Sequence, residues 1–165
     1  MSDNRTELHG VAGWLLLFVI TLAAVSPLRM AIGVYGSLYE TNAIGYSFGD
    51  AWGAVQTFEW SLVAISTAIL WFLTLRLFVK QTWSTVVTTI AGIWLVGPVG
   101  VLVEAVGVAM ITGNSAIALL GGVVGGFIQP LVYCVIWTSY LLLSKRVANT
   151  YPHRPVAEGV VRAFE

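Results

Sequence analysis

Four long apolar stretches follow one another along the chain, separated by short polar segments. They cover about residues 11–36, 55–79, 86–111 and 116–143. A helix needs about 20 mostly apolar residues to cross the hydrocarbon core of a bilayer, and each stretch exceeds this length. The pattern therefore predicts an all-α fold: a polytopic membrane protein whose residues 1–151 form a single bundle of four transmembrane helices.

The composition agrees with a chain surrounded by lipid. Hydrophobic residues make up 58% of the 165 residues and charged residues only 10%, whereas soluble domains carry about 25% charged residues. The first apolar stretch is longer than the core of a signal peptide, and its flank is mixed in charge, so we expect it to be retained as a helix. The formal net charge is zero, which argues against a nucleic-acid partner.

The basic residues near the helix ends predict the orientation. Arg76 and Lys80 flank the second connection, and further basic residues follow the last stretch: Lys145, Arg146, Arg154 and Arg162. The first connection contains Glu40 and Asp50 but no basic residue. Because basic residues collect on the cytoplasmic side, we expect both termini to be cytoplasmic. The tail 152–165 is interpreted as either a short amphipathic surface helix or a frayed end.

Three ionisable residues interrupt three different apolar stretches at a similar predicted depth. Arg29 lies 18 residues beyond Val11, and Glu104 lies 18 residues beyond Val86. At 1.5 Å per residue each is about 27 Å along its helix, whereas Glu59 lies only about 6 Å beyond Val55 on a helix of opposite direction. Arg29, Glu59 and Glu104 are thus predicted to share a layer near the outer interface.

This candidate polar cluster has three interpretations. The side chains reach the headgroups individually, or Arg29 pairs with a glutamate and ties the bundle together. Alternatively, the three residues line a small polar cavity that takes an ion, a headgroup or another small ligand.

The fourth stretch begins with a glycine-rich segment and ends with basic residues. The glycines form two overlapping GxxxG patterns: Gly121, Gly122, Gly125 and Gly126. Such a groove allows close helix packing, either within the bundle or against a second copy or another membrane protein. Ser144, Lys145 and Arg146 are expected to anchor the helix end at cytoplasmic anionic headgroups.

The sequence offers little catalytic chemistry. Cys134 is the single cysteine, and the two histidines, His9 and His153, lie outside the apolar stretches. A bis-histidine haem site or a histidine metal site within the membrane is therefore not expected. Phosphate-binding loops and hydrolase or metalloprotease motifs are also absent from the sequence. We expect no cofactor, no metal and no enzymatic activity.

Two segments resemble a known family. The fourth stretch ends with the run SYLLLSKRVANTY over residues 139–151, and the first contains GWLLL at 13–17 and SPLR at 26–29. These runs resemble the bacterial inner-membrane family catalogued as domain-of-unknown-function family 2569. The resemblance extends over about residues 10–151, although the middle of the chain carries no matching motif. It implies four helices and a bacterial inner membrane, and it brings no activity with it.

The function expected from the sequence is that of a small non-enzymatic accessory, assembly or scaffold component of a membrane complex. Its partners would be the lipid bilayer and another membrane protein or a second copy. The alternative is a transporter or sensor of a small ligand or ion that uses the polar layer near the periplasmic side.

Overall fold

The computed structural model describes residues 10–43, 51–113 and 116–152, with side chains for 10–42, 51–113 and 126–152. All regular elements in these residues are helical, and they form four long rods, which confirms the all-α four-helix prediction. The first rod begins with α1 (Trp14–Ile20), which continues through a π-helical turn (Thr21–Val25) into α2 (Ser26–Ala43). The second rod is α3 (Trp52–Val79). The third rod consists of α4 (Trp83–Trp94), a π-helical turn (Leu95–Val99) and α5 (Gly100–Thr112). The fourth rod is α6 (Ala116–Leu143).

Within the described residues, four helices are long and apolar enough to cross a membrane, at Trp14–Asn42, Trp52–Val79, Trp83–Thr112 and Gly126–Leu143. The chain is therefore a multi-pass membrane protein. After α6, Ser144 is extended and a short helix, α7 (Lys145–Thr150), follows. The predicted amphipathic tail lies outside the described residues from position 153 onward.

The first rod differs most from its predicted bounds, because it ends at Ala43 rather than at residue 36. The segment after Gly36 is polar but contains no proline, and the Thr41 hydroxyl donates to the Ser37 carbonyl at 2.8 Å. Hydroxyls bonded within the helix in this way are compatible with its continuation. The loss of hydropathy after Gly36 thus marks a change of surroundings and not the end of the helix.

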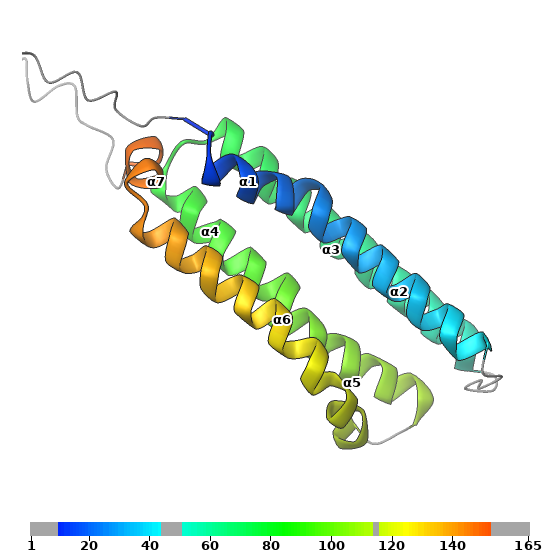
Figure 1. Cartoon of the computed structure of the whole chain (residues 1–165). Helices are drawn as coiled ribbons and strands as arrows, with labels where there is room; N and C mark the ends of the chain where they lie inside the picture. The colour runs from blue at the N-terminus through cyan, green and yellow to red at the C-terminus, as the bar shows by residue number, and fades with distance from the viewer. Residues whose placement is uncertain (1–9, 44–50, 114–115, 153–165) are drawn as a thin grey trace, which may run out of the picture.

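The rods pack around α3 and α6. α3 contacts α2, α4 and α5, whereas α6 contacts α4 and α5. Figure 1 shows α1, α2 and α3 on one side of the bundle and α4, α5 and α6 on the other. We call the end at which α1 begins, α3 ends and α7 lies the α7 end. The opposite end, where α2 ends and α3 begins, we call the α2–α3 end.

The buried hydrophobic core is concentrated toward the α7 end. It draws side chains from all four rods and from α7: Leu15, Phe18, Val19, Leu22, Leu70, Leu73, Leu77, Val86, Ile93, Cys134, Leu141, Val147 and Tyr151. Phe18 also stacks on Trp137 with ring centroids 4.8 Å apart, and this contact joins the first rod to α6. The core formed by the described side chains therefore lies mainly toward the α7 end.

Glycines on the third rod bring it close to α3. A Cβ added at Gly92 would overlap a terminal methyl of Leu73, and one added at Gly107 would overlap the ring of Phe58. Gly126, by contrast, has no atom within 4 Å of such a Cβ. The surroundings of Gly121, Gly122 and Gly125 lie outside the described side chains. The described close packing thus uses glycines that the sequence analysis did not single out.

The lone cysteine bonds to the backbone of the third rod near Pro98. Proline has no N–H to donate, and Pro98 lies inside the π-helical turn Leu95–Val99. The Cys134 thiol of α6 donates to the Ile93 carbonyl, with the Sγ–O distance 3.2 Å. Cys134 therefore joins α6 to the backbone of the third rod just before this turn.

The run SYLLLSKRVANTY folds back against the bundle through α7. Val147 and Tyr151 are fully buried, and the Tyr151 hydroxyl donates to the Leu77 carbonyl at 2.7 Å. The Thr150 Oγ1 accepts a bond from the backbone N–H of Gly10 at 3.0 Å. The most specific part of the family resemblance thus forms contacts within the chain. Lys145 is exposed and Arg146 is half-buried beside Gly13.

Candidate functional site

A pocket of about 170 Å³ lies between α2, α3 and α5 toward the α2–α3 end. Its lining is Gly33, Val34, Ser37, Leu38, Thr41, Trp52, Val55, Glu59, Glu104 and Val108. The helical period explains how each rod contributes. Residues spaced by three or four positions share one face of a helix, and the lining residues follow this spacing on all three helices.

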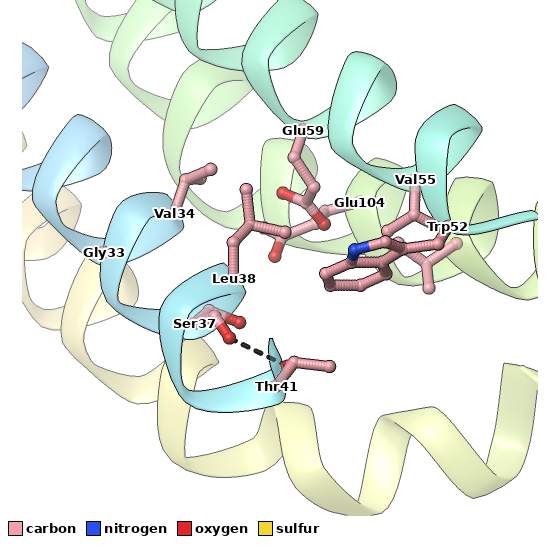
Figure 2. A pocket seen from close by; sticks show the side chains of 10 residues that line it. Gly33, Val34, Ser37, Leu38, Thr41, Trp52, Val55, Glu59 and Glu104 are labelled. Atoms are coloured by element: carbon pink, nitrogen blue, oxygen red, sulfur yellow. Dashed lines mark hydrogen bonds between the residues drawn. The ribbon is translucent and has the colours of Figure 1, made fainter. Parts of the chain in front are cut away.

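Two carboxylates from different helices meet in this pocket. Figure 2 shows the side chains of Glu59 and Glu104 directed toward each other, with the indole of Trp52 beside them. The two groups are close enough for electrostatic interaction. Glu59 is half-buried, whereas Glu104 is more exposed. When both carboxylates are ionised, their negative charges repel each other. The pocket therefore favours a positively charged occupant.

Hydroxyl groups on α2 complete the polar part of the lining. Ser37 and Thr41 face the carboxylates from the opposite wall (Figure 2). The Thr41 hydroxyl donates its proton to the Ser37 carbonyl, which leaves its oxygen lone pairs available to accept a bond. The remaining walls are apolar side chains, so the pocket combines a few hydrogen-bond acceptors with an apolar surface.

Arg29 does not line this pocket. It is exposed and lies on α2 one helical turn before Gly33, near the middle of the continuous helix Trp14–Ala43. Among the described residues, no ion pair joins it to either glutamate. The structure thus brings together two members of the candidate polar cluster and places the third nearer the centre of the bundle.

The sequence did not predict that Trp52, Ser37 and Thr41 line this pocket. All three lie in the segment 37–54 that it assigned to a connection, whereas the structure places them on α2 and α3. The spacing of Ser37 and Thr41 by four residues was a readable signal. It becomes informative only once the helix is known to continue past Gly36.

Polar side chains also join α6 to the first rod and to α4. The Thr21 and Tyr133 hydroxyls are 3.0 Å apart, and the Trp94 indole N–H donates to Thr138 at 3.1 Å. Among the described residues, no group of three or more His, Cys, Asp or Glu side chains is placed to hold a metal ion. The pocket with the two glutamates is therefore the strongest candidate site.

Comparison with known proteins identifies one family. A family model described as "Protein of unknown function (DUF2569)" matches residues 8–152. The chain matches no curated protein and no solved structure.

Proposed function

The chain belongs to the DUF2569 family of proteins of unknown function, and we propose that it is a non-catalytic membrane protein that binds a small organic cation. The site is the pocket between α2, α3 and α5. The observation that carries this proposal is the meeting of Glu59 and Glu104 in a pocket whose lining contains no basic side chain. A bound cation would offset the repulsion between the two carboxylates and would replace solvent around them.

The lining favours an ammonium group over a hard metal ion. Divalent Ca²⁺ requires six to eight oxygen ligands, whereas the pocket offers two carboxylates and the hydroxyls of Ser37 and Thr41 among mainly apolar walls. Trp52 adds an aromatic ring, and aromatic faces attract organic cations by about 0.5–2 kcal/mol. A primary, secondary or quaternary amine matches this combination.

The position of the core supports binding rather than conduction. The pocket lies toward the α2–α3 end, while the buried core occupies the bundle toward the α7 end. A ligand in the pocket therefore meets packed side chains, such as Phe18 and Leu22, on the way to the other end. This arrangement suits a sensor, or a carrier in a state open to one side.

We place the protein in a bacterial inner membrane with both termini in the cytoplasm. At the α7 end the described cations are Arg76, Lys80, Lys145 and Arg146, which is the pattern of a cytoplasmic face. The pocket would then open toward the periplasm and would sample ligands from outside the cell.

Binding measurements on the purified protein in nanodiscs test the proposal. We expect methylammonium or tetramethylammonium to raise the thermal unfolding midpoint more than NaCl at equal ionic strength. Glu59→Gln and Glu104→Gln should each weaken binding about tenfold, equivalent to about 1.4 kcal/mol. Glu40→Gln is the matched control, because Glu40 is exposed on α2 and does not line the pocket.

Two results would contradict a cation site. One is the absence of any ammonium-dependent stabilisation. The other is equal binding by wild type, Glu59→Gln and Glu104→Gln, because the carboxylates would then play no part.

A second candidate function is that of an accessory or scaffold subunit. It is favoured by Gly126 of α6, which is exposed and has no described neighbour from another part of the chain within 4 Å of an added Cβ. A partner helix could approach this surface closely. Co-purification of a stoichiometric membrane partner from mild detergent, reduced by Gly126→Leu, would support this role and not the ligand-binding role.

A further inference from the structure

A second groove lies on the face of α3 that points away from the core. It has a volume of about 180 Å³ and is lined by Phe72, Leu75, Arg76, Val79 and Lys80. The three apolar side chains are 56%, 64% and 76% exposed, respectively, so no described part of the chain covers them. The groove runs lengthwise toward the α7 end, where α3 ends at Val79.

Arg76 and Lys80 line this groove together with the three apolar side chains. Arg76 is half-buried, and its Nη2 donates to the Ser84 hydroxyl of α4 at 3.1 Å. This bond holds the guanidinium between the two helices. Lys80 is exposed and follows one turn later, directly beyond the helix end. The pair therefore lies where a membrane helix meets the headgroup layer.

Among the described residues, the α7 end carries basic side chains but no carboxylate. Within the part of the chain that the structure describes, the carboxylates are Glu40, Glu59 and Glu104, and none lies at the α7 end. Arg76 and Lys80 thus have no carboxylate partner among the described residues. Anionic phospholipids carry the missing charge on a phosphate and present acyl chains to the adjacent apolar groove.

We propose that the groove on α3 is a binding site for one anionic phospholipid. Its phosphate lies between Arg76 and Lys80, and one acyl chain lies along Phe72, Leu75 and Val79. A zwitterionic phospholipid offers the same chains but no net negative charge, so the site discriminates by headgroup. The proposal does not depend on the cation pocket, which lies toward the other end of the bundle.

Native mass spectrometry of the detergent-solubilised protein tests this site. We expect wild type to retain one phosphatidylglycerol in preference to phosphatidylcholine. The double variant Arg76→Gln/Lys80→Gln should bind phosphatidylglycerol at least tenfold more weakly, since each basic residue near a headgroup contributes about fivefold in affinity. Leu75→Trp, which fills the groove but keeps both cations, should also reduce retention.

The matched control is Lys145→Gln/Arg146→Gln, which removes the same charge from the same end of the bundle but leaves the groove intact. Equal loss of phosphatidylglycerol in both double variants would overturn the proposal, because only the total charge would then matter. Unchanged binding in Arg76→Gln/Lys80→Gln would also overturn it. If Arg76→Gln prevents folding, Lys80→Gln alone decides, because the Lys80 side chain is exposed. A defined site predicts that this variant binds about fivefold more weakly.

Discussion

Tyr151 caps the carboxyl end of α3 from a position far along the chain. The last carbonyls of a helix have no partner within it, and the Leu77 carbonyl receives its hydrogen bond from the Tyr151 hydroxyl. The ring is fully buried in the core. One side chain thus satisfies a buried acceptor and fixes α7 beneath the bundle.

Replacing Tyr151 with phenylalanine should destabilise the protein by about 1–3 kcal/mol, the cost of leaving a buried acceptor unsatisfied. The measurement is the unfolding midpoint in detergent, followed by circular dichroism. Tyr140→Phe is the control, because it removes the same atom from a half-buried ring that packs edge-on against Trp137. A loss of similar size in both variants would show that the capping bond is not the cause.

The same tyrosine gives a pH dependence. Burial raises the pKa of Tyr151 to about 12, whereas a tyrosine in the unfolded chain loses its proton near pH 10. A group with a raised folded pKa contributes stability that is complete below pH 10 and is lost as the pH rises through about 12. The stability difference between wild type and Tyr151→Phe should therefore shrink between pH 10 and pH 12. A constant difference would contradict this assignment.

At the residue scale, the sequence showed which charged residues interrupt the apolar stretches, but not at which level of the bundle each of them lies. Glu59 and Glu104 were singled out because carboxylates are rare in apolar stretches, and the structure places both in one pocket. Arg29 was placed with them by counting residues from a helix start at Val11. The helix runs from Trp14 to Ala43, so the same residue falls near its middle. Such counting depends on helix ends that hydropathy does not define.

At the level of elements, glycine positions decide how closely the rods approach. Gly92 of α4 faces Leu73 of α3, a side chain that is only 2% exposed. Two further atoms of Leu73 lie 3.1 and 3.2 Å from an added Cβ, so the leucine has little room to move. Gly36 of α2 has nothing within 4 Å.

Gly92→Ala should therefore destabilise the protein by about 1–3 kcal/mol, the usual cost of overpacking a core. Gly36→Ala should be neutral or stabilising by up to about 1 kcal/mol, because alanine favours the helix. Thermal unfolding of the two variants in the same detergent measures the difference. Equal midpoints would mean that α3 and α4 can separate without cost.

The four rods themselves were predictable because a membrane helix needs a long apolar run and little else. Their interruptions were less so. Nothing in the sequence indicated that Cys134 would donate to the Ile93 carbonyl. That pairing joins residues 41 positions apart and depends on how α6 packs. The sequence instead drew attention to the glycines of α6, of which only Gly126 has described surroundings.

At the scale of the whole molecule, the described core residues and the described charges are distributed unequally between the two ends of the bundle. The buried core and the four described cations Arg76, Lys80, Lys145 and Arg146 lie at the α7 end, whereas the carboxylates Glu59 and Glu104 line a pocket toward the other end. The same asymmetry provides a signal for orientation, since basic residues are retained on the cytoplasmic side.

The orientation is testable with single cysteines in bacterial cells that produce the protein. Cys134→Ser removes the native thiol and keeps a donor for the Ile93 carbonyl, and new cysteines replace the exposed Asn42 at the end of α2 or Gln81 between α3 and α4. A membrane-impermeant maleimide should label the Asn42→Cys protein in intact cells, and the Gln81→Cys protein only after permeabilisation. This result would show that the glutamate pocket lies toward the periplasm and the phospholipid groove lies in the cytoplasmic leaflet. The opposite labelling pattern would reverse both, because the two sites lie toward opposite ends of one bundle and must exchange sides together.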